Sequence, residues 1–452
     1  MRVTIIGAGY VGLTTGLALA FLQHRVTVVD KDPARIELLS SGKSPIHEPG
    51  IESLLASLGP EVNFTSDTRA AVADAELIMI AVGTPPKTNG EADTRYVEEA
   101  AREVAEGLRG GRSYTLVLKS TVPVGTNHLV ANVVQQALQD RGVKTEVHLA
   151  SNPEFLREGR ALRDTFYPDR IVVGAEHPKA IEALRGLYSP ILEQTFDPPR
   201  FLPRPEGYGL PPLIVTDPTS SEMTKYTANA FLALKISFIN EIAGLCEKVG
   251  ADVVEVARGI GYDPRIGHGF LGAGLGWGGS CFPKDTAALV SMAQKHGYAM
   301  PIVEASRIVN QRQRLHLVDR LETILKRVSN RTIGVLGLAF KPGTDDLRES
   351  PALGLIEILL ERGANVRVHD PVALENAKRE LRNDRVEFFR DPYAIAEGAD
   401  ALVLATEWPE YRSLDFERLR TKMRSPVLLD GRNFLDPTGL RKAGFVYIGV
   451  GR

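Results

Sequence analysis

The sequence has few cysteines and no long hydrophobic run. Its two cysteines, Cys246 and Cys281, are far apart in a chain of 452 residues. This excludes a disulfide framework and a cysteine-based metal site, and it favours a reducing cytoplasm. No stretch approaches the ~18 uninterrupted apolar residues of a membrane-spanning helix, and no secretory signal precedes the strand-like residues 3–6. We expect a cytoplasmic, water-soluble protein with no metal and no membrane partner.

The charge shows no excess of either sign that would attract a polyelectrolyte. Lys and Arg total 54 against 56 Asp and Glu, which leaves a net charge of -2. The basic field of a nucleic-acid-binding protein is therefore missing. The hydrophobic fraction of 43% and the charged fraction of 24% are those of an ordinary globular protein. At roughly 100–200 residues per domain, the length predicts two to four domains.

The N-terminal segment contains a dinucleotide-binding pattern. A β-branched run, residues 2–7, leads into GAGYVG, in which Gly7, Gly9 and Gly12 open an alanine-rich helical stretch. A second strand-like run ends in Asp30. Glycines at these positions let backbone amides approach a pyrophosphate at the N-terminus of a helix. The alternative is a tight strand–helix turn that binds no cofactor.

The residues around Asp30 bear on which dinucleotide would bind. A carboxylate here accepts hydrogen bonds from the adenosine ribose and repels a 2′-phosphate, which favours NAD over NADP. Lys31 and Arg35 weaken this preference, because either could neutralise a phosphate.

Strand-like and helix-like stretches then alternate, which predicts a doubly wound parallel sheet with ligands beyond the carboxyl ends of its strands. The expected strands are residues 76–82, 113–120, 146–151 and 170–174, with a helix near 94–108. Polar, proline-containing loops follow three of them. In these loops, Thr121 and Glu154 are candidates for contact with reacting groups. The alternatives are a turn hydroxyl and a surface acid.

The rest of the chain divides at a proline-rich stretch. Six prolines within residues 196–213 predict a linker. We expect an α/β fold with two Rossmann-like doubly wound domains, 1–212 and 330–452, joined by a central helical domain, 213–329. The second α/β domain lacks a GxGxxG. Its basic residues Lys341, Arg348 and Arg432 could pair with phosphates or form surface salt bridges.

The central region contains the most unusual stretch, GAGLGWGGSCFPKD at 272–285. Five glycines in eight positions precede Cys281. Such a loop can bring backbone amides close to a ligand, so this cysteine is a candidate nucleophile. The alternative is a buried, inert cysteine, which we expect Cys246 to be. Upstream, Lys225 and Asn229 share one face of a predicted helix and could stabilise an oxyanion, or they could lie on a solvated face.

Taken in order, these motifs resemble the UDP-glucose/GDP-mannose dehydrogenase family over essentially the whole chain. The matching segments are GAGYVG, STVPVGT, NPEFLREG, EMTKYTANAFLALKISFINE, GWGGSCFPKD, FKPGTDDLRES and DGRN. The resemblance implies NAD-dependent four-electron oxidation of UDP-glucose to UDP-glucuronate. Rival hypotheses are GDP-mannose or a UDP-N-acetylhexosamine as substrate, a two-electron alcohol dehydrogenase, and a non-catalytic NAD or nucleotide-sugar sensor. FPKD after the cysteine favours UDP-glucose.

The resemblance also implies roles for individual residues. The catalytic group would comprise Cys281, Lys225, Asn229, Asp285, Thr121 and Glu154. NAD would contact Gly7, Gly9, Tyr10, Val11, Gly12, Asp30, Lys31, Arg35, Thr84, Thr121 and Arg348. The sugar nucleotide would contact Glu154, Phe155, Leu156, Lys225, Asn229, Phe270, Leu271, Gly278, Lys341 and Arg432. The central helices would form a homodimer, in which Arg265 reaches the partner's sugar-nucleotide site. The sequence departs from the family at Trp277, where Phe or Tyr is usual, and at Ala273, where Pro is common.

The chemistry implied is covalent. Cys281 would add to a bound aldehyde, and the thiohemiacetal would lose hydride to give a thioester, which water hydrolyses. Lys225 and Asn229 would stabilise the oxyanions. Asp285 and Thr121 would hold the water and Glu154 would carry protons, although the division of roles among these three stays open.

Overall fold

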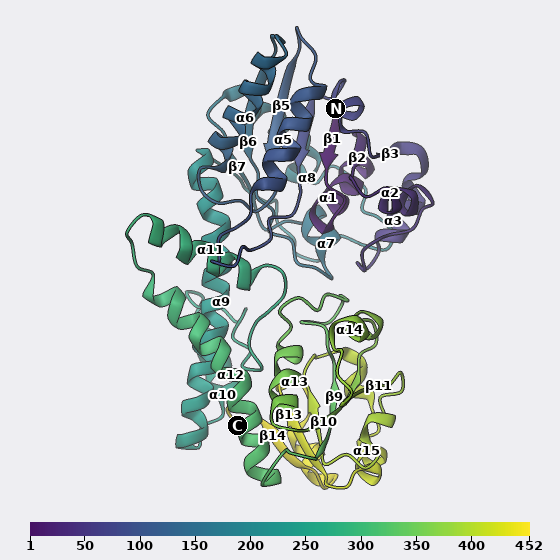
Figure 1. Ribbon diagram of the computed structural model, residues 1–452, viewed down its shortest axis with the longest axis vertical. Coiled ribbons are helices and arrows are strands. Elements are labelled where there is room, and N and C mark those ends of the chain that lie inside the picture. The colour runs from purple at the N-terminus through teal and green to yellow at the C-terminus, as the bar shows by residue number, and fades with distance from the viewer. The chain divides into compact units, whose positions relative to one another are not determined.

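The computed structural model describes residues 1–452, apart from the side chain of Pro60. The chain divides into two compact units, Met1–Thr227 and Ala228–Arg452. The first contains an eight-stranded sheet and the second a six-stranded sheet. The expected α/β class, with two Rossmann-like sheets and a helical region between them in the sequence, is confirmed (Figure 1).

The sheet of the first unit has the order β3-β2-β1-β4-β5-β6-β7-β8. Its strands are β1 (Arg2–Ile6), β2 (Arg25–Val29), β3 (Val62–Thr65), β4 (Leu77–Ile80), β5 (Ser113–Leu118), β6 (Glu146–Ser151), β7 (Ile171–Gly174) and β8 (Leu213–Thr216). The strand order reverses between β1 and β4, so the loops after these strands diverge. A crevice at such a reversal is where open α/β sheets bind ligands.

The last two strands of this sheet, β7 and β8, are parallel to each other and run against the other six strands. β3 to β6 pair in parallel along the sheet, but β7 is antiparallel to β6, with Ser151 opposite Gly174. The connection contains only the short helix α7 (Ala161–Phe166). At ~1.5 Å per residue such a helix is too short to return the chain to the end of the sheet where β6 begins. The chain therefore re-enters the sheet from the side where β6 ends, and the sequence expectation of an all-parallel sheet is wrong at β7 and at β8.

Helices cover both faces of the first sheet. They are α1 (Tyr10–Phe21), α2 (Pro33–Ser40), α3 (Ile51–Leu58), α4 (Thr68–Val72), α5 (Arg95–Gly107), α6 (Thr126–Asp140), α7 and α8 (Pro178–Glu193), with a 3₁₀ turn at Gly59–Glu61. In β4, Leu77 and Met79 join a core with α1, α3, α7 and α8, whereas Ile78 and Ile80 join a core with α4, α5 and α6. This alternation places the two helix layers on opposite faces.

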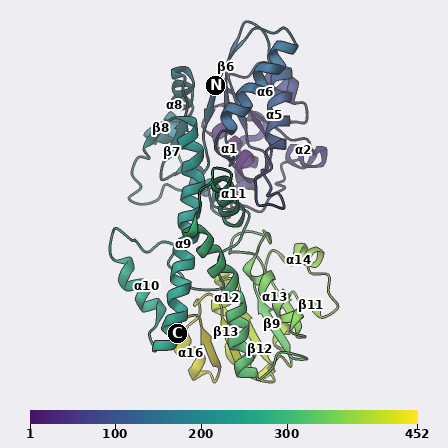
Figure 2. The ribbon, with the colours of Figure 1, turned by 60° about the vertical axis from the view of Figure 1, so that its left-hand side comes forward.

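The long helix α9 (Pro218–Val249) runs across the boundary between the units. Asp217 accepts a hydrogen bond from the backbone N–H of Ser220 at 2.8 Å, and Pro218 occupies the first turn, which is a favourable start for a helix. The helix ends before Gly250, whose φ is +78°. In Figure 2, α10 and α12 flank the second-unit half of α9.

Three more helices of the second unit follow α9. They are α10 (Val253–Gly261), α11 (Phe282–Lys295) and α12 (Pro301–Leu325). The long helix α12 lies within residues 213–329, where the sequence predicts a helical region. The separate helix α11, which begins directly after Cys281, was not expected from the sequence.

The sheet of the second unit is fully parallel, in the order β11-β10-β9-β12-β13-β14. Its strands are β9 (Thr332–Leu336), β10 (Asn365–His369), β11 (Val386–Phe388), β12 (Ala401–Leu404), β13 (Val427–Asp430) and β14 (Val446–Gly449). Its helices are α13 (Pro351–Glu361), α14 (Leu374–Glu380), α15 (Phe416–Lys422) and α16 (Pro437–Lys442), with 3₁₀ turns at Ala394–Ala396 and Pro409–Ser413. β11 and β14 are the edge strands of this sheet.

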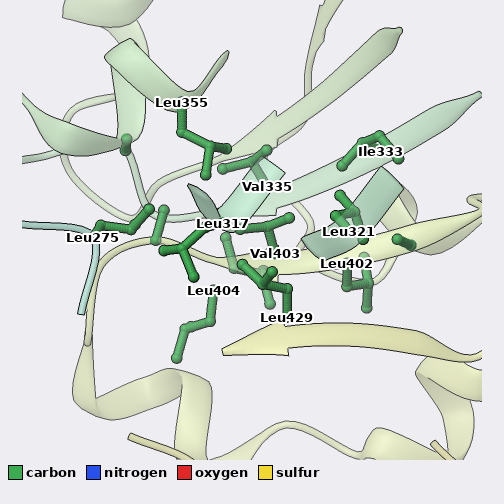
Figure 3. Packing of buried hydrophobic residues seen from close by; sticks show 14 of the residues in the cluster. Leu275, Leu317, Leu321, Ile333, Val335, Leu355, Leu402, Val403, Leu404 and Leu429 are labelled. Atoms are coloured by element: carbon green, nitrogen blue, oxygen red, sulfur yellow. The ribbon is translucent and has the colours of Figure 1, made fainter. Parts of the chain in front are cut away.

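The core of the second unit joins the sheet to α12. Figure 3 shows Leu317 and Leu321 of α12 near Val335, Val403 and Leu429 of the strands. All five side chains are buried. Strands that are buried on both faces read as continuous apolar runs, which is why β9, β12 and β13 show no polar alternation.

Candidate active site

The glycine-rich turn after β1 has the packing that a dinucleotide-binding turn needs. Gly7 has φ +105°, a conformation that L side chains rarely adopt. A Cβ on Gly12 would lie 1.9 Å from the carbonyl oxygen of Gly7, whereas a Cβ on Gly9 would meet no atom within 4 Å. Gly12 therefore permits close packing of the turn, while Gly9 leaves open space at the N-terminus of α1. These residues fit a bound pyrophosphate.

Asp30 follows β2 and supports the same turn. Its Oδ2 accepts the backbone N–H of Ala8 at 2.8 Å, and its Oδ1 accepts that of Asp32 at 3.0 Å. The Arg35 guanidinium lies 3.2 Å from Oδ2. Arg35 is therefore already paired with a carboxylate, which makes it a poorer partner for a 2′-phosphate and supports the expectation of NAD. Lys31 is exposed, and its ammonium lies over the ring of Tyr96 at 4.8 Å.

The other NAD candidates of the first unit belong to neighbouring segments. The Thr84 hydroxyl donates to the carbonyl oxygen of Thr121 at 2.7 Å, which joins the loops after β4 and β5. The Tyr10 hydroxyl donates to the carbonyl oxygen of His47 at 3.0 Å. Val11, in the first turn of α1, is half-buried.

Two of the predicted catalytic residues form a buried ion pair in the first unit. The Nζ of Lys225 on α9 lies 2.9 Å from Oε1 of Glu154. The other carboxylate oxygen of Glu154 accepts the backbone N–H of Leu156 at 2.8 Å. The Phe155 ring has its centroid 5.3 Å from this ammonium and 3.8 Å from the Arg170 guanidinium. A cation and a carboxylate in direct contact, away from water, can exchange a proton and can stabilise developing charge.

Lys119 is a residue that sequence reasoning missed. It is buried at the end of β5, where its ammonium donates to Asn152 Oδ1 at 3.0 Å and to the Tyr188 hydroxyl at 3.3 Å. These bonds tie together the ends of β5 and β6, from which the loops with Thr121 and Glu154 begin. The sequence did contain a signal for this residue. Lys119 ends the apolar run LVLK, and a lysine buried there needs a polar partner, since lysine is almost never buried without one.

In the second unit, Cys281 occupies the cap position at the N-terminus of α11, with Pro283 in the first turn. The Ser280 hydroxyl lies 3.5 Å from its sulfur. A helix N-terminus carries a partial positive charge, and thiolates are stabilised at such a position. Cys246, by contrast, is buried in the hydrophobic core, as expected.

Asp285 lies one turn into α11. Its Oδ2 accepts from the side-chain amide of Asn229 at 2.6 Å, and its Oδ1 lies 2.5 Å from Nζ of Lys284. Its backbone N–H donates to the carbonyl oxygen of Cys281 at 2.8 Å. The structure thus brings Asn229 and Asp285 together beside the turn that carries the cysteine. Asn229 follows Lys225 by one turn of α9. This helix therefore supplies one candidate catalytic residue to the first unit, Lys225, and one to the second, Asn229.

The glycine-rich loop before Cys281 is held by buried polar groups. Asn310 accepts the backbone N–H of Trp277 at 2.8 Å and donates to its carbonyl oxygen at 2.9 Å. The indole N–H of Trp277 donates to Ser237 Oγ at 2.9 Å, a bond that Phe could not make. A Cβ on Gly278 would lie 2.0 Å from the carbonyl oxygen of Glu349, so the loop requires glycine at that position.

Arg432 connects this loop to the second sheet. Its Nε donates to the carbonyl oxygen of Ala405 at 2.7 Å and lies 3.2 Å from Glu407 Oε2. Its terminal nitrogens donate to the carbonyl oxygens of Gly276 and Phe340, both at 3.3 Å. The guanidinium thus lies where the cysteine loop meets the end of the strands, at a place suited to a phosphate or base.

The remaining sugar-nucleotide candidates are near the same loop in sequence. Phe270 has φ +64°, a conformation uncommon for a residue with a Cβ, and Leu271 is buried in the core of the second unit. Lys341 lies over the Phe340 ring at 5.1 Å.

Two predicted arginines are paired with acids next to them. Arg348 contacts Asp346 at 2.7 Å, and Arg265 contacts Asp263 at 2.5 Å. The Arg265 side chain is 87% exposed. Beyond its ion pair, the carbonyl oxygen of Arg348 accepts the backbone N–H of Gly279 at 3.0 Å, in the loop before the cysteine.

Comparison with known proteins agrees with this geometry. Three domain models of the UDP-glucose/GDP-mannose dehydrogenase family match the chain: the NAD binding domain at residues 1–192, the central domain at 219–312 and the UDP binding domain at 334–437. The matches come in the order NAD domain, central domain, UDP domain. Together they cover most of the chain.

Individual relatives match over the full length. The chain is 45% identical to the UDP-glucose 6-dehydrogenase of Rhizobium meliloti (strain 1021), covering 100% of both chains. It is 43% identical to UDP-glucose 6-dehydrogenase TuaD of Bacillus subtilis (strain 168), covering 100% of this chain and 93% of the relative. A solved UDP-glucose dehydrogenase from Pyrobaculum islandicum superposes with a TM-score of 0.87 at 41% identity, covering 99% of this chain and 97% of that one. The chain is an NAD-dependent dehydrogenase and belongs to the UDP-glucose/GDP-mannose dehydrogenase family.

Proposed function

We propose that the chain oxidises UDP-glucose to UDP-glucuronate with two NAD per sugar. The observation that carries this proposal is Cys281 at the N-terminus of α11, with Asp285 one turn further and held by Asn229. A two-electron alcohol dehydrogenase has no use for a cysteine in this setting. The full-length relatives named UDP-glucose 6-dehydrogenase support this choice of substrate.

The cofactor site of the first unit has what NAD requires. Gly9 leaves room for a pyrophosphate at the N-terminus of α1, and Asp30, which supports the same turn, would accept hydrogen bonds from the adenosine ribose. When bound there, NAD accepts the hydride in each oxidation. We propose Lys31, Arg35, Thr84, Thr121 and Arg348 as further contacts.

In the first oxidation the C6 hydroxyl of the sugar loses a proton and a hydride to give an aldehyde. Lys225 and Asn229 would donate hydrogen bonds to the developing alkoxide, which such donors stabilise by roughly 3–4 kcal/mol in comparable sites. Glu154 would take up the proton, because its carboxylate already contacts the Lys225 ammonium.

In the second oxidation the Cys281 thiolate forms a bond to the aldehyde carbon. Loss of hydride from this thiohemiacetal leaves a thioester on Cys281. Water held by Asp285 and Thr121 would attack the thioester carbonyl, break the C–S bond and release the acid. Overall, one sugar nucleotide and one water give one carboxylate and three protons, while two NAD become NADH. Because the thiol must stay reduced, we propose a cytoplasmic location.

The sugar-nucleotide contacts that the family resemblance implies are proposed residue by residue. They are Glu154, Phe155, Leu156, Lys225, Asn229, Phe270, Leu271, Gly278, Lys341 and Arg432. GDP-mannose is the second candidate substrate, because the matching family includes enzymes for it.

The test is NADH production at 340 nm with UDP-glucose, UDP-N-acetylglucosamine, UDP-N-acetylmannosamine and GDP-mannose in parallel. We expect two NADH per UDP-glucose and little from the others. One NADH with released aldehyde would contradict the covalent mechanism. Activity with another sugar alone would change the substrate but not the mechanism, and no activity with any would favour a sensor.

The two cysteines supply a matched pair of variants. Cys281→Ala should stop formation of the acid while UDP-glucose still binds, as measured by calorimetry. Cys246→Ala, in the core, should keep the NADH stoichiometry at some cost in stability. Steady acid production by Cys281→Ala would overturn the role of the thiolate.

We also propose a homodimer through a central domain, residues 213–329. The exposed face of α9 carries Phe231, Phe238, Leu245 and Val249, all at least 49% exposed. Their spacing of seven, seven and four residues places them on one side of the helix. Among the described residues, α9 is the helix long and apolar enough to cross a bilayer, but 44% of its most apolar window is buried within the protein.

A second copy would cover this apolar stripe, and Arg265 would then contact the partner's sugar nucleotide. We expect sedimentation to show a dimer for the wild type and a monomer for the double variant Phe231→Glu, Phe238→Glu. A fully active wild-type monomer would contradict the proposal.

A further inference from the structure

We propose that Glu222 is a positioning residue, which fixes the loop bearing Thr121 relative to Lys225. Its Oε2 accepts the backbone N–H of Gly125 at 2.7 Å, and its Oε1 accepts that of Asn127 at 2.8 Å. The side chain is buried, with 2% exposure. One carboxylate from α9 thus binds two backbone N–H groups in the first turn of α6.

The start of α6 needs this external partner. Gly125 is its cap residue, with φ +91° and no side chain that could accept a backbone N–H. The first N–H groups of a helix have no partner within the helix and carry a partial positive charge. A carboxylate is the best acceptor for them, and here it comes from a helix that follows much later in the chain.

The loop held in this way carries a proposed catalytic residue. At its first end, the carbonyl oxygen of Thr121 accepts from the Thr84 hydroxyl at 2.7 Å. At its second end, Gly125 is bound to Glu222. Across this second end, the Thr126 hydroxyl donates back to the carbonyl oxygen of Pro123 at 2.6 Å. The segment is therefore short, internally bonded and fixed at both ends.

Glu222 also connects this loop to the ion pair of Lys225 and Glu154. Glu222 and Lys225 are three residues apart on α9, so they lie on the same side of the helix. Lys225 in turn contacts Glu154 at 2.9 Å. If the two bonds of Glu222 are lost, Thr121 can move relative to Lys225 and Glu154 while each residue stays chemically intact.

A second buried glutamate provides a matched control. Glu48 accepts the backbone N–H groups of Gly159 and Ala161, both at 2.7 Å, at the start of α7. It is 5% exposed. The chemistry and burial resemble those of Glu222, but Glu48 does not hold the loop bearing Thr121. It holds residues 159–161, and the carboxylate of Glu154 before them is fixed separately by Lys225 and by the backbone N–H of Leu156.

The experiment compares Glu222→Gln, Glu222→Asp and Glu48→Gln with the wild type, and it rests on the proposed function for its kinetic part. In Glu222→Gln an amide N–H faces one of the two backbone N–H groups, and in Glu222→Asp the carboxylate is too short to reach both. We expect both variants to lower kcat by about tenfold to hundredfold, because displacements of ~1 Å have that effect. In both Glu222 variants we expect KM for UDP-glucose to change less than about twofold. The control Glu48→Gln should lose as much Tm as Glu222→Gln but keep kcat within about twofold of wild type.

Equal losses of kcat in Glu222→Gln and Glu48→Gln at equal loss of Tm would overturn the proposal, because both carboxylates would then be merely structural. A second readout needs no activity: amide hydrogen exchange of residues 119–128 should rise in Glu222→Gln and not in Glu48→Gln. An unchanged exchange rate there would also overturn it. An inactive wild type would refute the proposed function alone and leave the exchange comparison to decide on Glu222.

Discussion

Lys225 and Glu154 form an ion pair at 2.9 Å in which both side chains are more than nine-tenths buried. Breaking a buried pair by removing one partner leaves the other charge without compensation, which costs about 3–5 kcal/mol. We expect Lys225→Met and Glu154→Gln each to lower the free energy of unfolding by this order. The double variant should lose less than the two single losses together, because no buried charge remains.

Urea unfolding of the wild type, both single variants and the double variant gives the coupling free energy between Lys225 and Glu154. All three variants should lack NADH production with UDP-glucose. Strict additivity of the two losses would show that the pair contributes nothing. Activity in the double variant would show that its charges are not needed for the reaction.

In the glycine-rich turn, we expect substitution of Gly9 to weaken NAD binding and substitution of Gly12 to lower the stability of the fold. Gly9→Ala adds a Cβ in open space, with φ −78° that alanine adopts readily, so Tm should be unchanged. Because that space is where a pyrophosphate would approach, KM for NAD should rise by about tenfold or more, since one lost contact to a charged group is worth 1.5–3 kcal/mol. Gly12→Ala places a Cβ 1.9 Å from the Gly7 carbonyl oxygen and should lower Tm. A lowered Tm in Gly9→Ala with unchanged KM would contradict this.

Asp285→Asn keeps the shape of the side chain and removes its charge. Lys284 and Asn229 then both lose a charged acceptor, and water beside the thioester loses its partner. We expect kcat to fall by about 10²–10³ with little change in the KM for NAD. As a control, Asp252→Asn at the cap of α10 should keep kcat within about twofold, because Asn and Asp cap helices equally well. Equal kcat in the two variants would contradict a role for Asp285 in the reaction.

The pH dependence of stability should carry a contribution from Glu222. Burial raises the pKa of Glu222 from 4.5 to about 7, although the hydrogen bonds from Asn127 and Gly125 act in the opposite direction. The folded state therefore binds more protons than the unfolded state between these pH values. The contribution of this group to the free energy of unfolding is highest below pH 4.5, falls as the pH rises to about 7 and is constant above that.

Glu222→Gln removes this titration. The free energy of unfolding of the wild type relative to the variant should fall by roughly 2–3 kcal/mol between pH 5 and pH 8, at about 1.4 kcal/mol per pKa unit. Urea unfolding at these two pH values measures it, and other titrating groups cancel because both proteins carry them. A difference that does not depend on pH would contradict the raised pKa.

The sequence by itself determined the local features. The strand–turn–helix at the N-terminus depends on glycines and on Asp30 within one short stretch, and hydrophobic periodicity marks its strands and helix. Likewise, five glycines before Cys281 mark a loop that no packing argument is needed to find. These signals act between residues near in sequence, so they can be read without the fold.

Only the tertiary structure decided which distant groups meet. The reversed direction of β7, the pairing of Lys225 with Glu154 and the bonds of Glu222 to the start of α6 join segments far apart in the chain. Cys281 was evident as a residue, but its place at the N-terminus of α11 was not. Periodicity shows which face of an element is buried and not what it is buried against. The path of the chain through the sheet settles that, since it determines which carboxylate can reach which ammonium or helix end.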